Sequence, residues 1–251
     1  MSELRTERLQ SFDGAELAVH RFGAGRPVLL LHGLFSSAEM NWIRFGHAER
    51  LAAAGFEAIM PDLRAHGASD KPHDPAAFPN DVLVRDAATV TEVLKLADFD
   101  LVGFSLGART AARAVISGLS PRRLVLAGMG LEGLAGWDRR AAFFIDAIDR
   151  FEEVRQGDSA YMAVQFMKTM KVDRVAARLL LQSVDDTAAE DLVAIKMPTL
   201  VVCGDKDRDN GSPQALVDAL PDARLQQVPG THMSSVTEAA LGEAIASFLA
   251  A

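Results

Sequence analysis

The sequence predicts an α/β protein in which a mostly parallel sheet carries helices on both faces. Five short apolar runs with turn residues at their ends support this prediction: PVLLLHG (27–33), FEAIMPD (56–62), FDLVGFS (99–105), RRLVLAG (122–128) and PTLVVCGD (198–205). Segments of helix length separate most of these runs. Continuous apolar strands that alternate with helices are typical of parallel sheets buried on both faces. The 251 residues can form one large domain of this kind.

The remaining elements follow in chain order. Residues 7–12 and 15–22 alternate weakly between apolar and polar side chains around Asp13-Gly14, which predicts a hairpin. We expect further elements as follows: helices at 37–54, 80–97, 106–118 and 212–220, a last strand at 223–230, and a closing helix at 234–250.

One stretch interrupts this alternation. Residues 131–193 contain no convincing strand, but they show helical periodicity in RRAAFFIDAIDRFEEV, SAYMAVQFMKTM and VDRVAARLLLQSV. In open α/β sheets the ligand crevice lies beyond the carboxyl ends of the strands, and an insertion that leaves from such an end would lie over it. We therefore predict a core of residues 1–130 and 194–251, with a helical cap (131–193) inserted after the sixth strand.

The composition narrows the possible partners. The net charge is −8 and the pI is near 5.3, with no cluster of Lys and Arg, which disfavours nucleic acid as a partner. The single cysteine, Cys203, excludes an internal disulfide and suits a reducing compartment. The first residues lack the apolar segment of a signal peptide, and no apolar stretch approaches the roughly 20 residues of a membrane span. We expect a cytoplasmic protein that acts on a small molecule and has no membrane partner.

No cofactor is predicted. The His, Cys, Asp and Glu residues show no metal-ligand spacing, and no G-x-G-x-x-G follows the first strand of the sheet. We therefore expect neither a metal ion nor a dinucleotide.

The segment LVGFSLG places Ser105 between Gly103 and Gly107, where a predicted strand meets a predicted helix. In so tight a turn only glycine lets the neighbouring backbone pass, and the serine hydroxyl stands exposed at the tip. Because G-x-S-x-G occurs by chance in roughly one chain in ten of this length, the motif needs support from the rest of the chain. A serine nucleophile requires an imidazole base, which is in turn oriented by a carboxylate.

Only one histidine, His232 in VPGTHMS, follows Ser105 in the chain. Before it, VVCGDKDRDNG contains Asp205, Asp207 and Asp209 just past the end of a predicted strand. His232 is the base if the triad follows the order serine, acid, histidine. That order does not choose among the three aspartates.

Five segments together resemble the α/β-hydrolase superfamily over nearly the whole chain: LLLHGL, MPDLRAHGASDKP, LVGFSLG, VVCGDKD and VPGTHM, in family order and at family-like spacing. The resemblance is to the serine-nucleophile branch, which includes small bacterial esterases and non-haem perhydrolases. It implies the α/β-hydrolase fold. It also implies that the second Asp of G-D-x-D, Asp207, is the triad acid, with Asp205 as the next candidate.

An acyl-transfer site also needs two hydrogen-bond donors for the oxyanion. One is expected to be the main-chain N–H of Leu106, which follows the nucleophile at the start of a helix. The resemblance implies that the other is the N–H of Leu34 in LLLHGLFSS, with Phe35 as the alternative.

Several polar residues near these motifs are expected to be structural. We interpret His32 as a residue that holds its loop by hydrogen bonds. The same interpretation applies to the polar residues of PDLRAHGASDKP, which are Asp62, Arg64, His66 and Ser69.

The nature of the nucleophile indicates the reaction. Dehalogenases and epoxide hydrolases form an ester on an aspartate, whereas Ser105 would form a stable ether with such substrates, so acyl transfer is favoured. The resemblance supports hydrolysis of carboxylic esters. The same triad also serves lactonases, thioesterases, perhydrolases and carbon–carbon hydrolases. Some proteins of this fold act instead as small-molecule receptors or signalling partners with little turnover.

The predicted cap carries many large, soft side chains that we expect to line an apolar pocket for a largely apolar ester. The candidate pocket residues are Phe35, Met129, Phe143, Phe144, Met162, Phe166, Met167 and Met170.

A cation in the first turn of the helix after Ser105 opposes the helix dipole, so Arg109 needs compensation. We expect Arg109 to pair with an acid such as Asp86 or Asp205 and to have a structural role. The alternative is that it holds a substrate carboxylate.

Overall fold

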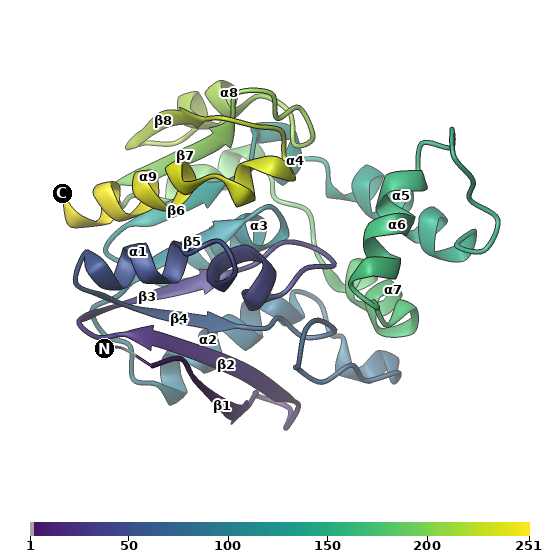
Figure 1. Ribbon diagram of the computed structural model, residues 1–251, viewed down its shortest axis with the longest axis horizontal. Helices are drawn as coiled ribbons and strands as arrows, with labels where there is room; N and C mark the ends of the chain where they lie inside the picture. Colours follow the sequence, from purple (N-terminus) through teal and green to yellow (C-terminus); the bar gives the residue numbers. More distant parts are fainter. Residues whose placement is uncertain (1–2) are drawn as a thin grey trace.

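The computed structural model describes residues 3–251 and contains an eight-stranded, mostly parallel sheet with helices on both faces (Figure 1). The strand order is β1-β2-β4-β3-β5-β6-β7-β8. The strands are β1 (Arg5–Gln10), β2 (Glu16–Gly23), β3 (Arg26–Leu31), β4 (Phe56–Pro61), β5 (Asp100–Phe104), β6 (Leu124–Ala127), β7 (Thr199–Gly204) and β8 (Ala223–Val228). Only the pairs β1–β2 and β2–β4 are antiparallel, so the predicted fold class is confirmed.

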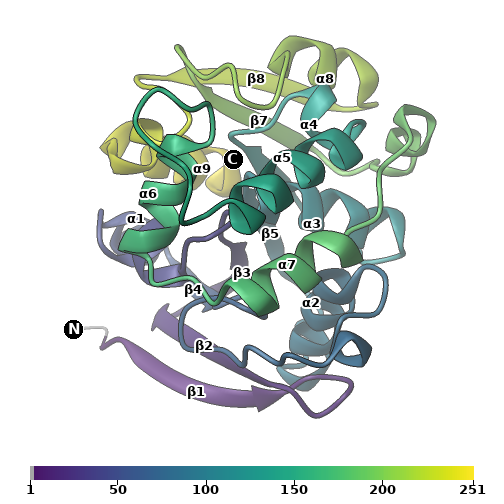
Figure 2. The same cartoon turned by 90° about the vertical axis from the view of Figure 1, so that its right-hand side faces the viewer.

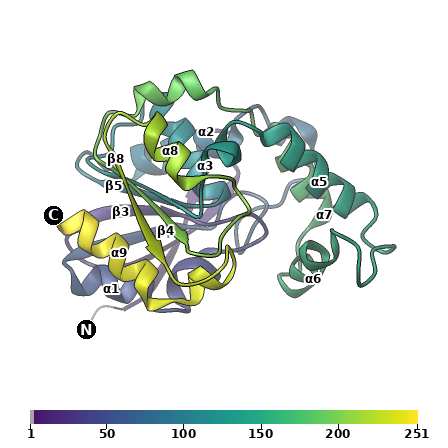
Figure 3. The same cartoon turned by 90° about the horizontal axis from the view of Figure 1, so that it is seen from above.

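The helices cover the sheet in two layers (Figure 3). Helices α1 (His47–Ala53) and α9 (Ala239–Ala250) pack on one face, and α2 (Val82–Val93), α3 (Leu106–Ile116) and α8 (Pro213–Ala219) pack on the other. Each face has its own cluster of buried apolar side chains, because the strands alternate their side chains between the two faces. Among the described residues, no helix combines the length and the apolar character that crossing a bilayer would need.

The segment predicted as one helix at 37–54 is divided into two. A short π-helical turn, η1 (Glu39–Ile43), precedes α1, and Gly46 between them has a φ of 74°. This left-handed conformation ends any continuous helix, so the single-helix prediction is wrong at this point. Similarly, a 3-10 turn, η4 (Ser234–Thr237), begins the segment predicted as one helix at 234–250. A second such turn, η2 (Pro75–Ala77), lies in the loop before α2.

Four helices lie between β6 and β7, where the sequence predicted a helical insertion. They are α4 (Leu131–Leu134), α5 (Trp137–Asp149), α6 (Tyr161–Thr169) and α7 (Arg174–Ser183), followed by a 3-10 helix, η3 (Ala189–Ala194). Figure 2 shows α5, α6 and α7 in front of one end of the sheet. Residues 131–193 are called the helical insertion below.

Candidate active site

Ser105 lies in the sharp turn between β5 and α3, with φ 53° and ψ −113°. Residues other than glycine rarely adopt a positive φ, and the strain costs on the order of 1–3 kcal/mol. A Cβ at Gly103 would overlap the backbone of Gly107, and a Cβ at Gly107 would overlap the carbonyl group of Leu31. The tight packing of α3 against β3 and β5 therefore requires both glycines, and it holds the serine at the tip of the turn.

His232 approaches Ser105 from the loop after β8. Its Nε2 lies 3.0 Å from Ser105 Oγ, and its Nδ1 lies 2.9 Å from Asp207 Oδ2. An ionised carboxylate only accepts hydrogen bonds, so Nδ1 carries the proton and Nε2 faces the serine hydroxyl as an acceptor. The imidazole also packs against the ring of Phe104, with the ring centroids 5.0 Å apart.

The structure separates the three aspartates that the triad order left open. Asp207 is buried, accepts the His232 hydrogen bond, and accepts a second one of 3.0 Å from the main-chain N–H of Asp209. Asp205 accepts instead from the N–H of Gly230 at 2.8 Å, and so braces the loop that carries His232. Burial alone would raise the pKa of Asp207, but its hydrogen bonds and the charges of His232 and Arg140 outweigh this and hold the pKa below its ordinary value. The carboxylate is therefore ionised at neutral pH.

The loop after β3 lies beside the nucleophile. A Cβ at Gly33 would come 3.5 Å from Ser105 Cβ, and the N–H of Gly33 donates to Asn41 Oδ1 at 3.0 Å. Within the described chain, the main-chain N–H groups of Leu34 and Leu106 have no hydrogen-bond acceptor. The N–H of Phe35 donates to His66 Nε2 at 2.9 Å, which removes Phe35 as the alternative oxyanion donor.

The residues expected to hold the loops have that role in the structure. His32 Nε2 accepts from the N–H of Leu63 at 2.9 Å, and its Nδ1 donates to the carbonyl of Gly33 at 2.8 Å. Asp62 accepts from the main-chain N–H groups of Ala38 and Ala68 at 2.8 and 2.7 Å. These bonds join the loop after β3 to the loop after β4.

Two further residues complete this loop network. Ser69 Oγ donates to the carbonyl of Asp62 at 2.6 Å. Arg64 pairs with Asp13 and Asp86, at 2.6 and 2.8 Å. Asp86 is therefore already paired with Arg64 and does not serve Arg109, contrary to one of the expected pairings.

Part of the chain matches a known family model. Residues 26–129 fit the model described as the alpha/beta hydrolase fold. The strand order and the turn at Ser105 agree with this match. The chain has the α/β-hydrolase fold.

Proteins that are similar to this chain carry different names. The AB hydrolase superfamily protein YisY of Bacillus subtilis is 27% identical over 214 residues, which cover 76% of this chain and 78% of that protein. An epoxide hydrolase of Caballeronia sordidicola is 35% identical over 104 residues, covering 41% of this chain and only 31% of that protein. An esterase from Exiguobacterium antarcticum has the same fold at 20% identity, with a TM-score of 0.79 over 98% of this chain and 100% of that one.

A cavity of about 870 Å³ opens beside Ser105. Its walls come from the loops after β3, β5 and β7, from the His232 loop, and from α5 and α6 of the helical insertion. Most of the lining side chains are apolar. They include Leu34, Phe35, Leu106, Met129, Phe143, Phe144, Met162 and Phe166 of the predicted site.

Two predicted pocket residues do not line the cavity. The residues of α6 that line it are Met162, Ala163, Gln165, Phe166 and Thr169, which share one face of the helix. Met167 points away from that face and is buried among apolar side chains, and Met170 follows the last residue of the helix. The prediction is therefore wrong for Met167 and Met170, because methionine content does not reveal which face of a helix meets the cavity.

Other lining residues were not predicted. They include Asn41, which holds the Gly33 loop, and Trp137 and Arg140 at the start of α5. Asn41 lies 64 residues before the nucleophile in the chain, and nothing in its neighbourhood indicates a role. The aromatic residue at 137, near the start of the predicted insertion, is the one signal that could have extended the predicted pocket.

The acid partner expected for Arg109 is also different. Arg109 contacts Asp186 at 3.1 Å, and neither Asp86 nor Asp205. Asp186 lies 77 residues after Arg109 in the chain. No sequence pattern indicates this pair, because Asp186 lies far from Arg109 in the chain and outside any motif.

Among the described residues, one group of side chains at the loops after β7 and β8 could be considered for a metal ion. Ligand atoms of Asp207, Asp209 and His232 all lie within 4.8 Å of one another. Both ring nitrogens of His232 already have partners in Asp207 and Ser105, so a metal ion would have to displace one of them. The hydrogen-bonded chain explains this group without a metal ion.

Proposed function

We propose that this α/β-hydrolase is a serine hydrolase that cleaves carboxylic esters through an acyl-enzyme intermediate. The observation that carries the proposal is the chain of hydrogen bonds from Ser105 Oγ through His232 to Asp207, at the wall of an apolar cavity. A nucleophile, a base and an orienting carboxylate at these distances form the arrangement that acyl transfer requires.

The proposed reaction has two stages. In the first, His232 Nε2 takes the proton of Ser105 as Oγ attacks the ester carbonyl, and then gives it to the departing alcohol oxygen. In the second, water attacks the acyl-enzyme with the same proton transfers in turn, which releases the acid and restores Ser105. Asp207 holds the imidazole in the correct tautomer and stabilises the imidazolium in both stages.

The N–H groups of Leu34 and Leu106 are the proposed oxyanion donors. Both residues line the cavity next to Ser105, and both N–H groups are free of acceptors within residues 3–251. Donors that are already in place stabilise the tetrahedral oxyanion without reorganisation. The side chain of Leu34 is therefore free to vary, whereas its backbone position is not.

The nucleophile argues against epoxide hydrolysis, although a relative bears that name over part of its length. An aspartate nucleophile forms an ester with an opened epoxide, which water then cleaves, whereas Ser105 would form an ether. We also propose that residues 131–193 act as a cap, since α5 and α6 form the cavity wall opposite the sheet. Because that wall is rich in Phe and Met, we propose medium-length, largely apolar esters as substrates.

The test is a burst experiment with p-nitrophenyl butyrate on the wild-type protein and on Ser105→Ala. We expect a burst of p-nitrophenol close to one per protein, followed by steady turnover, and a loss of about 10⁴-fold or more in Ser105→Ala. Mass spectrometry of the quenched burst should show the butyryl group on Ser105. Tight binding of the ester without turnover would overturn the proposal in favour of a receptor.

A further inference from the structure

Arg109 joins the nucleophile helix to both ends of the helical insertion. It lies one helical turn after Ser105 in α3, and its side chain is 1% exposed. Its Nη1 donates to the carbonyls of Gly133 and Leu134, at 2.9 and 2.5 Å. These two residues belong to the first crossing, where the chain passes from β6 toward α5.

The second amino group of Arg109 reaches the other end of the insertion. Its Nη2 donates to the carbonyl of Asp185 at 2.5 Å and to Asp186 Oδ1 at 3.1 Å. These residues form the second crossing, where the chain returns from α7 toward β7. One planar guanidinium therefore bridges two segments that lie about fifty residues apart, a geometry that a point-like lysine ammonium does not reproduce.

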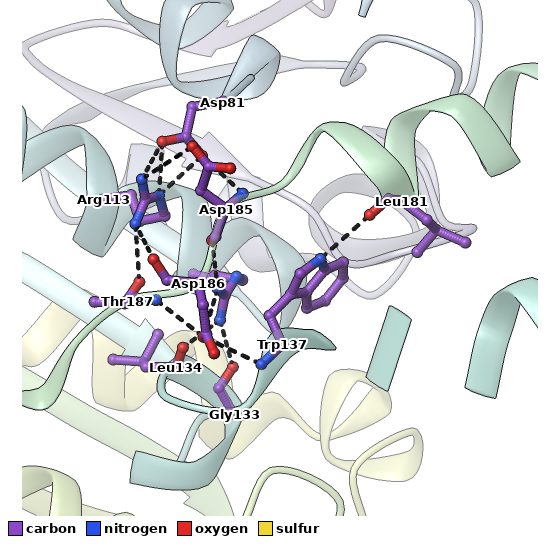
Figure 4. Close-up of polar contacts among 10 residues, drawn as sticks. Asp81, Arg113, Gly133, Leu134, Trp137, Leu181, Asp185, Asp186 and Thr187 are labelled. Carbon is purple, nitrogen blue, oxygen red and sulfur yellow. Dashed lines mark hydrogen bonds and ion pairs between the residues drawn. The ribbon is translucent and has the colours of Figure 1, made fainter. Parts of the chain in front are cut away.

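Trp137, the first residue of α5, completes the contact. The guanidinium carbon of Arg109 lies 4.9 Å from the centroid of the Trp137 ring. Figure 4 shows the main-chain N–H of Trp137 directed at Asp186 and its indole N–H directed at the carbonyl of Leu181, at 3.1 and 3.3 Å. The start of α5 is thereby fixed relative to both Arg109 and the second crossing.

The fifth donor of Arg109, its Nε, differs from the other four. Its Nε is buried and has no acceptor among the described residues, and the other four N–H groups are occupied. Burial lowers the pKa of Arg109 to about 10, so the side chain is still charged at neutral pH and is balanced by Asp186. A substrate carboxylate could therefore meet only the buried Nε of Arg109, because all four N–H groups of Nη1 and Nη2 are already occupied.

Arg113 offers a matched control on the same helix. It lies one further turn along α3 and binds Asp81, just before α2, together with the carbonyl of Asp186 at 2.5 Å (Figure 4). It contacts only the second crossing, and it does not line the active-site cavity, whereas Arg109 does. Both arginines thus lie on α3, carry a positive charge and contact Asp186. Only Arg109 also contacts the first crossing and Trp137.

We propose that Arg109 is a positioning residue that determines substrate specificity, because it sets the place of α5 relative to Ser105. Helix α5 carries Phe143 and Phe144 on the cavity wall, so a shift of its first turn changes the room for a long acyl or alkyl group. A short ester needs little of this wall. The effect on specificity rests on the proposed function, whereas the placement of α5 does not.

The placement is tested by hydrogen exchange and tryptophan fluorescence on Arg109→Met, Arg109→Lys and Arg113→Met. We expect faster exchange in residues 131–140 and a red shift of emission in both Arg109 variants, and neither change in Arg113→Met. Arg109→Lys keeps the charge and provides the result if Arg109→Met does not fold. Unchanged exchange in 131–140, or the same change in Arg113→Met, would overturn the proposal.

The specificity is tested with p-nitrophenyl acetate and p-nitrophenyl hexanoate on the same variants. We expect KM for the hexanoate to rise about tenfold in the Arg109 variants, with kcat for the acetate within about twofold of wild type. Equal losses for both esters would overturn the specificity role. If the wild-type protein cleaves neither ester, the proposed function fails, and hydrogen exchange and fluorescence alone then decide the placement of α5.

Discussion

The loops at the carboxyl edge of the sheet and the helical insertion are held in place in different ways. The edge loops, residues 32–38 and 62–70, are joined by buried side chains such as His32 and Asp62, which are 0% and 3% exposed. The insertion is joined to the core through its first and second crossings, and its own ion pairs, such as Arg150–Asp146, lie at the surface. Surface pairs of this kind contribute little stability. The comparison indicates that the core around the candidate site is held more firmly than the insertion.

The largest effect is expected in the firmly held core, in Asp207→Asn on the loop after β7. The amide would stabilise the wrong tautomer of His232, so we expect kcat/KM for p-nitrophenyl butyrate to fall about 10³- to 10⁴-fold. Asp209→Asn, at an exposed position of the same loop, is the matched control and should retain activity within about threefold. Equal losses in the two variants would contradict the proposal that Asp207 is the carboxylate that orients His232.

A glycine in the core and a glycine in the insertion give the next contrast. In Gly107→Ala the new Cβ would overlap the Leu31 backbone, which cannot move aside, so we expect a loss of roughly 3 kcal/mol or more in the free energy of unfolding. Gly157 in the insertion has a φ of 100° but open space around it, and Gly157→Ala should cost only about 1 kcal/mol. Urea unfolding of both variants measures the difference, and a mild effect at Gly107 would contradict the tight packing of α3.

The edge loops should also make the protein sensitive to acid. Burial lowers the pKa of His66 to about 3, so the folded state favours the neutral imidazole, which accepts from the N–H of Phe35. The unfolded chain takes up the proton near pH 6.5, so this stability is complete above about pH 6.5 and is lost as the pH falls toward 3.

Urea unfolding at two pH values tests this contribution. Between about pH 7 and about pH 5.5, His66 should account for roughly 1 kcal/mol of lost stability, and His66→Asn should remove that part of the dependence. The exposed His73, which contacts Asp173 of the insertion, gives a comparison variant, His73→Asn, that tests whether the loss of any histidine has the same effect. A slope in His66→Asn equal to that of the wild type would assign the acid sensitivity to other groups.

The smallest effect is expected in the helical insertion, in Met162→Ser. Met162 lines the cavity from α6 and is 74% exposed, so the free energy of unfolding should stay within about 0.5 kcal/mol of wild type. The loss of its apolar contact should lower kcat/KM for the hexanoate by about threefold and leave the acetate unchanged. A larger loss of stability would mean that α6 is packed as firmly as the edge loops.

The sequence was informative where a feature depends on neighbouring residues. The strands and most helices follow from local apolar patterns, and the turn at Ser105 follows from Gly103 and Gly107 beside it. The position of His232 followed from its being the one histidine after the nucleophile, and Asp207 required the resemblance to a family. Their catalytic roles stay predictions, although the structure places the three side chains in contact.

Only the tertiary structure decided which distant groups meet. Arg109 contacts Asp186, which lies 77 residues away in the chain. Asn41, in η1, accepts a hydrogen bond from the N–H of Gly33 because η1 folds back over the loop after β3. The inward and outward faces of α6, which exclude Met167 from the cavity, depend on how the insertion docks. Local propensity arises from interactions within a few residues, whereas these contacts depend on how the whole chain closes and on which charges burial then forces to pair.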